Sequence, residues 1–99
     1  MMPIICTLTP EAIRAARGGL LPGLADRAER REAIEDGYRL TFAGSGETLL
    51  AIAATIDAER QCCRWLRFEM TVAADGGPIV LTLRGPAGAR EFLEALFSV

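Results

Sequence analysis

Two adjacent cysteines, Cys62 and Cys63, are the residues of this 99-residue chain whose type and spacing point most directly to chemistry. A cysteine thiolate is a nucleophile and a ligand for soft metal ions such as Cu(I) and Zn(II). Because the chain has no histidine, a soft-metal site must depend on these thiolates. Its metal ligands would be Cys62, Cys63 and, for a trigonal site, Cys6, with a carboxylate from Glu59 or Glu69.

The residue types that are absent exclude much other chemistry. The chain contains no histidine, lysine or asparagine. Without histidine there is no Ser-His-Asp triad, no Cys-His pair and no imidazole ligand for zinc. Without lysine there is no Schiff base and no P-loop lysine. We therefore expect no catalytic residues and a binding role rather than an enzymatic one, with a soft metal ion as the one cofactor that the sequence suggests.

The surroundings of the cysteine pair act on its acidity in opposite directions. Arg60, Arg64 and Arg67 lie close in sequence and would stabilise a thiolate. The C-terminal end of a helix carries a partial negative charge and would disfavour one. Cys63 continues the apolar face of the preceding helical segment, whereas Cys62 lies about 100° away around the helix. One thiol can therefore be buried while its neighbour is accessible.

Two other hypotheses for the cysteines stay open. Cysteine often serves as a small buried apolar side chain. In that case the protein would be a protein-interaction or homodimerisation module, with Trp65 and Arg67 at the contact surface, since Trp and Arg are enriched in interface hot spots. Trp65 can equally be covered by a helix of its own chain. In the third hypothesis, a thiol-redox protein, Cys62 and Cys63 form a strained and easily reduced vicinal disulfide.

Charge and hydropathy predict where the chain acts. The net charge is −2 and only 6% of residues are aromatic, so nucleic acid is not an expected partner. The longest apolar run covers residues 49–56, far short of the ~20 residues that span a bilayer. The first residues lack the basic region of a signal peptide. We therefore expect no membrane partner and a cytoplasmic location, where thiols stay reduced.

The elements that must position these residues are predicted from periodicity and turn signals. We expect a strand over residues 4–8; a helix from 10 to about 34, either kinked or divided in two near residues 18–22; a strand over 38–42; a helix from about 46 to 62 that Ser45 caps; a hairpin of strands over 65–72 and 79–84; and a last helix that starts at residues 85–86.

This order, β-α-β-α-β-β-α, predicts a single domain over residues 1–99. The fold class would be α/β or α+β, a two- to three-layer sandwich with a sheet of about four strands. A thioredoxin-like arrangement has the same order of elements, although a shared fold does not transfer a function. Cys6 approaches the cysteine pair more easily if the strand over 38–42 runs antiparallel to the strand over 4–8.

Several segments together give the sequence a resemblance to a known group. They are the pattern E-R-x-C-C-x-[FW]-L-x-F at residues 59–68, D-G-G-P at 75–78, G-P-x-G-A-R-E-F-L at 85–93 and C-T-L-T-P at 6–10. This combination resembles a group of short, uncharacterised bacterial proteins. The resemblance implies a stand-alone bacterial domain, and it carries over no catalytic residues because no activity is attached to the group.

Overall fold

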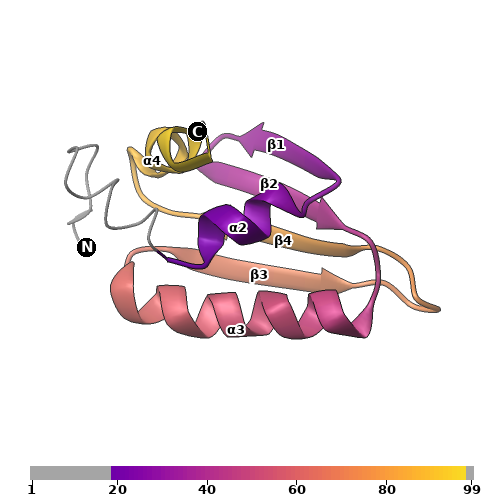
Figure 1. The fold of residues 1–99 in the computed structure, drawn as a ribbon. Coiled ribbons are helices and arrows are strands. Elements are labelled where there is room, and N and C mark those ends of the chain that lie inside the picture. The colour runs from indigo at the N-terminus through magenta and orange to yellow at the C-terminus, as the bar shows by residue number, and fades with distance from the viewer. Residues whose placement is uncertain (1–18, 98–99) are drawn as a thin grey trace.

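The computed structural model describes residues 19–97, in which three helices lie against one side of a four-stranded antiparallel sheet (Figure 1). The elements follow in the order α2 (Leu21–Asp26), β1 (Arg30–Ile34), β2 (Gly37–Phe42), α3 (Gly46–Cys62), β3 (Arg67–Val72), β4 (Ile79–Arg84) and α4 (Ala89–Phe97). The α+β class and the four-stranded sheet confirm the prediction. The expected strand over residues 4–8 lies outside the described residues, and the thioredoxin-like arrangement depends on that strand.

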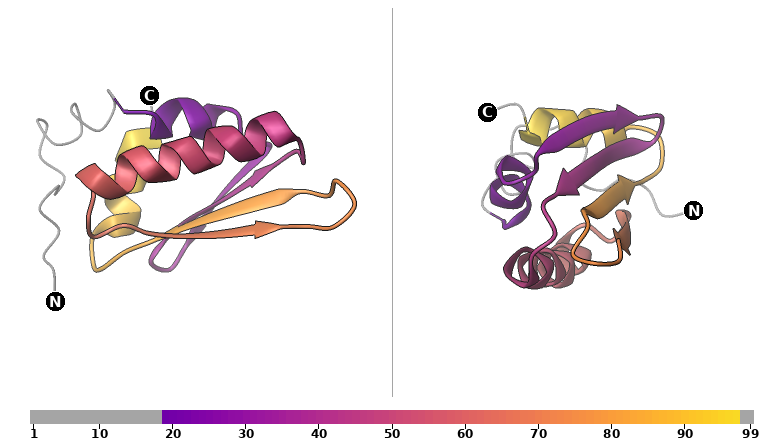
Figure 2. Two further views of the ribbon diagram at one scale, coloured as in Figure 1. Left: turned by 90° about the horizontal axis from the view of Figure 1, so that it is seen from below. Right: turned by 90° about the vertical axis from the view of Figure 1, so that its right-hand side faces the viewer.

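The sheet has the strand order β1-β2-β4-β3, and every pairing is antiparallel. Leu81 of the central strand β4 lies opposite Leu40 on one side and Met70 on the other. Opposed residues of antiparallel strands point to the same face, so these three share the face that the helices cover. The other face carries polar rows such as Glu32, Arg39, Thr82 and Glu69, which lie in register across all four strands. Figure 2 shows the helices gathered on one side of the sheet.

The hydrophobic core lies between this sheet face and the helices. Leu40, Leu81 and Leu83 of the central strands are fully buried. From α4, the side chains of Ala89, Phe92, Leu93 and Leu96 are buried, which confirms the predicted apolar face of that helix. The helix itself begins at Ala89 rather than at residues 85–86, after a turn in which the Ala89 N–H donates to the Pro86 carbonyl at 3.0 Å.

Helix α3 forms as its sequence predicts. Ser45 is the N-cap, and its Oγ accepts a hydrogen bond from the Thr48 N–H at 3.1 Å, which satisfies one of the free N–H groups of the first turn. Three residues one turn apart, Ile52, Thr55 and Glu59, face inward and are buried. The Thr55 hydroxyl donates to the Ala51 carbonyl at 2.8 Å, so its polar atom is satisfied within the helix.

The prediction of a helix as far as residue 34 is wrong, because Arg30–Ile34 form strand β1. This strand pairs with β2 from Arg30 opposite Thr41 to Ile34 opposite Gly37, so that residues 35–36 form a hairpin turn. The charged residues Arg30, Arg31 and Glu32 fit a helix surface and an exposed edge strand equally well. Backbone hydrogen bonding with β2 selects the strand over the helix.

The hairpin of β3 and β4 confirms the prediction, with Val72 opposite Ile79 at its closed end. Its turn places Asp75 and Gly76 at positive φ, 57° and 70°, the conformation that tight hairpin turns favour. The first strand is shorter than expected, since β3 begins at Arg67. Before it the chain turns, and the Leu66 N–H donates to the Cys63 carbonyl at 3.0 Å.

Candidate functional site

The C-terminal end of α3 brings Cys63 into the core. Its N–H donates to the Glu59 carbonyl at 2.7 Å, so Cys63 continues the helical hydrogen bonding as the C-cap residue. The residue is 5% exposed and belongs to the core cluster with Leu66 and Ile52. The sequence prediction that Cys63 continues the apolar face of the helix is therefore confirmed. Cys62 is the last residue of α3, but its side chain and the whole of Cys6 lie outside the described part of the chain.

Glu59 is the residue whose surroundings most need a chemical explanation. It lies one helical turn before Cys63 and is only 4% exposed. Burial raises the pKa of its carboxyl group. Within residues 19–97 no hydrogen bond or ion pair to this carboxyl group is formed. Burial of a carboxyl group is costly unless a partner offsets it, which makes Glu59 a candidate ligand.

Glu59 and Cys63 lie on the same side of the helix. Residues four positions apart have Cβ atoms about 5–6 Å from each other on a helix surface. A carboxylate and a thiolate at this spacing can both reach a single metal ion. Among the side chains that the structure describes, no group of three or more His, Cys, Asp or Glu residues could hold a metal ion. The described part therefore supplies two possible donors, Glu59 and Cys63.

The arginines predicted to support the cysteines point elsewhere. Arg60 binds Asp57, with its Nη2 and Nε 2.9 Å and 3.1 Å from the Asp57 Oδ1. Arg64 lies exposed in the turn that follows α3. Arg60 is therefore engaged by Asp57, and Arg64 faces solvent. Arg60 helps to hold the last turn of α3 instead.

Trp65 is a core residue rather than an exposed contact residue, which corrects one hypothesis. It is 7% exposed, and its ring meets that of Phe92 from α4 edge to face, with ring centroids 5.3 Å apart. A helix of the same chain therefore covers it. Its neighbour Arg67 is 75% exposed and pairs with Glu69 at 3.3 Å. The Trp65 Nε1 is buried and has no hydrogen-bond partner within the described residues.

A chain of ion pairs beside Trp65 was not predicted from the sequence. Arg84 Nη1 lies 2.8 Å from Asp36 Oδ1, and Arg84 Nε lies 3.1 Å from Glu69 Oε1. Hydrogen bonding to Glu69 raises the pKa of Arg84. Asp36, Arg67 and Arg84 border a pocket of about 270 Å³ together with Trp65 and Gly85. Because the two arginines are balanced by two carboxylates, the cluster links the ends of three strands and does not favour an anion. Arg84 reaches Glu69 diagonally across the hairpin, since the residue directly opposite Glu69 is Thr82 and the residue opposite Arg84 is Arg67.

In the described part of the chain, no helix has the length and hydropathy needed to cross a membrane. Comparison of the chain with protein-family models, with curated proteins and with solved structures found no match. The resemblance to short bacterial proteins with the Cys-Cys segment therefore stays a prediction, and the functional argument depends on the geometry of this chain alone.

Proposed function

We propose that this protein binds a soft metal ion, or another thiophile, at the C-terminal end of α3. One observation carries the proposal: the Glu59 carboxyl group is buried one helical turn from the buried residue Cys63. No group in residues 19–97 pairs with the Glu59 carboxyl group. An ionised carboxylate and a thiolate are both costly in an apolar surrounding. A cation bound by both would offset that cost, as partners do for buried charges elsewhere.

The ligand set that we propose follows from the chemistry of the donors. Cys63 and Cys62 supply thiolates, Glu59 supplies a carboxylate, and Cys6 supplies a third thiolate where the N-terminal segment reaches them. Thiolate donors select Cu(I), Zn(II) and heavier thiophilic ions over Mg(II) and Ca(II). The cytoplasm is the proposed location, since its reducing conditions keep such cysteines available.

Titration of the reduced, metal-free protein with Cd(II) tests the proposal through the thiolate-to-metal absorption band. We expect one ion per chain, loss of binding in Cys63→Ala and Cys62→Ala, and an affinity about 10- to 100-fold lower in Glu59→Gln. Glu35→Gln is the matched control, because Glu35 is an exposed carboxylate in the β1–β2 turn. Circular dichroism of each variant establishes that it is folded. Uptake that neither cysteine substitution changes, or no uptake at all, would refute the metal site.

A protein-interaction or homodimerisation module is the second candidate, and a different observation favours it. Leu50 of α3 is 73% exposed, and Leu20, just before α2, is 52% exposed. A pocket of about 400 Å³ between α2 and α3 is lined by Leu20, Ala51 and Ala54 among others. The small side chains of Ala51 and Ala54 let a second helix approach closely. We propose a second copy of this chain as the occupant, with cysteines that are structural.

Light scattering over a range of protein concentrations tests this second candidate. A homodimer gives a mass that rises with concentration toward twice 10.7 kDa. Leu50→Glu abolishes the dimer by placing a charge in the contact, whereas Glu47→Gln, on the same helix, leaves it unchanged. A concentration-independent mass of one chain would refute it.

A further inference from the structure

A buried hydrogen-bond donor lies at the end of α3 that holds Glu59 and Cys63. The indole Nε1 of Trp65 is buried, and within residues 19–97 no atom accepts a hydrogen bond from it. A buried tryptophan N–H ordinarily finds an acceptor, and a donor left without one costs free energy. The Trp65 N–H is therefore a donor for which the described part of the chain supplies no acceptor.

Backbone hydrogen bonds hold Trp65 close to the two candidate ligands. The Cys63 N–H donates to the Glu59 carbonyl at 2.7 Å, and the Leu66 N–H donates to the Cys63 carbonyl at 3.0 Å. The second bond closes a four-residue turn in which Trp65 is the third residue. Glu59, Cys63 and Trp65 are 4%, 5% and 7% exposed, so all three lie in the interior at the same end of α3.

The ring of Trp65 is fixed by its neighbours. It meets the Phe92 ring edge to face, with the two ring planes at 86°. A Cβ atom at Gly85 would lie 2.9 Å from Cε3 and 3.0 Å from Cζ3 of the indole, so this edge of the ring packs against Gly85. Nε1 belongs to the opposite side of the indole and faces away from Gly85. A ring packed closely on two sides cannot turn its N–H toward solvent without disturbing the core.

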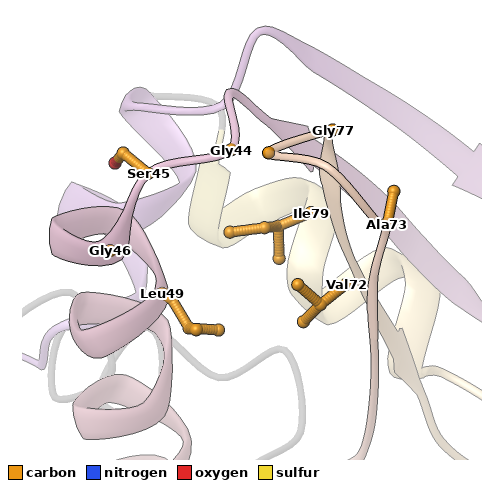
Figure 3. Close-up of a pocket in the computed structure, with 9 residues that line it drawn as sticks. Gly44, Ser45, Gly46, Leu49, Val72, Ala73, Gly77 and Ile79 are labelled. Carbon is orange, nitrogen blue, oxygen red and sulfur yellow. The ribbon is translucent and has the colours of Figure 1, made fainter.

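The opposite end of α3 has a different environment. A pocket of about 200 Å³ lies there, and the apolar side chains of Leu49, Val72 and Ile79 come together around it (Figure 3). Among the described residues, no acidic, basic or cysteine residue lines this pocket. The unpaired polar groups of Glu59 and Trp65 lie instead at the C-terminal end of the helix, where a ligand finds groups to bind.

We infer that the Trp65 N–H donates a hydrogen bond to a coordinating atom, the Cys63 sulfur or a Glu59 oxygen, when a metal ion binds at this end of α3. The inference rests on the proposed metal site and makes Trp65 a positioning residue for its ligands. Coordination removes the proton from a thiol or carboxyl ligand. The anionic atom that results is a stronger acceptor than the neutral group. The N–H therefore lacks an acceptor in the metal-free chain and gains one on binding.

Titration of the reduced, full-length protein with Cd(II) tests the inference through two replacements of Trp65. Trp65→Phe removes the N–H together with part of the ring. Incorporation of 3-benzothienylalanine at position 65 removes the N–H and keeps the shape of the ring. We expect either change to lower the Cd(II) affinity about 10-fold or more. Tyr38→Phe, which removes an aromatic hydrogen-bond donor that pairs with Glu94, is the matched control and should leave the affinity unchanged.

The stability of the metal-free variants separates positioning from support of the core. The benzothienyl variant should be as resistant to denaturant as the unsubstituted protein or more so, because it loses a donor that has no acceptor. A residue with only a structural role would not lower the Cd(II) affinity while it leaves stability intact. Equal Cd(II) affinities of the benzothienyl variant and the unsubstituted protein overturn the inference.

The indole proton gives a direct readout, since Trp65 is the only tryptophan. We expect its nuclear magnetic resonance signal to move downfield as Cd(II) binds, because hydrogen bonding deshields the proton. The shift persists in Glu59→Gln when the Cys63 sulfur is the acceptor and is lost when a Glu59 oxygen is. Cd(II) uptake that leaves the indole signal in place overturns the inference and leaves the metal site standing. Absence of Cd(II) uptake by the unsubstituted protein refutes the metal site, and the inference with it.

Discussion

Burial of a carboxyl group without a partner weakens a fold, and no group within residues 19–97 pairs with the buried Glu59. Replacing it with leucine, which has a similar volume, removes the cost of burying a polar group. We expect Glu59→Leu to raise the free energy of unfolding of the metal-free protein by about 1–2 kcal/mol. Chemical denaturation measures this change. Glu35→Leu, at an exposed position, should change stability by less than about 0.5 kcal/mol. A loss of stability in Glu59→Leu would show that the carboxyl group has a stabilising partner.

Tyr38 is the second residue whose surroundings alter its titration. Burial first, and then the charge and the hydrogen bond of Glu94, raise its pKa above 10.0. Its hydroxyl donates to Glu94 Oε2 at 3.4 Å. A raised pKa in the folded state means that this contribution to stability is complete below pH 10.0 and is lost as the pH rises through the folded-state pKa.

Ultraviolet absorbance follows this titration directly, because Tyr38 is the only tyrosine. We expect a midpoint above 10.0 in the folded protein. Glu94→Gln should lower the midpoint without bringing it fully to the value of a free tyrosine, because burial remains. Glu91→Gln, on the same helix, should leave it unchanged. A midpoint at or below 10.0 would contradict the proximity of Glu94.

At the scale of elements, capping residues and apolar periodicity in the sequence predicted α3 and the buried face of α4 correctly. Ser45 marked the start of α3, and the repeat of apolar residues in α4 gave its buried face. The same local features did not predict β1, because its charged residues fit either a helix or an edge strand. The pairing of β1 with β2 selects the strand, and that pairing is a contact between elements. Glu59 was named from the sequence only as a supporting ligand. Its burial could not be predicted, since acidic residues on a helix are ordinarily exposed.

Strand β2 requires a glycine at its first residue, Gly37, because the backbone of β4 lies very close there. A Cβ atom at residue 37 would lie 1.7 Å from the Leu83 carbonyl oxygen. Gly37→Ala therefore forces β2 away from β4 and should cost about 1–3 kcal/mol or more. Gly46→Ala is the control, since a Cβ atom there meets nothing within 4 Å and alanine favours a helix. Thermal unfolding should show a lower midpoint for Gly37→Ala only; equal midpoints would contradict the close approach.

At the scale of the whole molecule, one side of the sheet carries both the core and the candidate site. Within residues 19–97 the helices α2, α3 and α4 lie on this side (Figure 2). Side chains of the opposite face include Arg39, Thr82 and Glu69, which lie in register across three strands. The end of α3, with Glu59 and Cys63, therefore faces the same interior as the aromatic pair of Trp65 and Phe92. A substitution in the core beneath α4 should therefore also affect the residues at the C-terminal end of α3.

Phe92 is the residue that tests this connection. It is buried and supports Trp65, so Phe92→Ala should lower the free energy of unfolding by about 3–5 kcal/mol. That is a large share of the ~5–15 kcal/mol that stabilises a domain. Fluorescence of Trp65, the only tryptophan, and circular dichroism should follow the same unfolding transition in the unsubstituted protein. Phe97→Ala, at the half-buried end of α4, should cost less and leave the fluorescence of the folded state unchanged. If Phe92→Ala altered neither stability nor Trp65 fluorescence, the core would not extend from α4 to the end of α3.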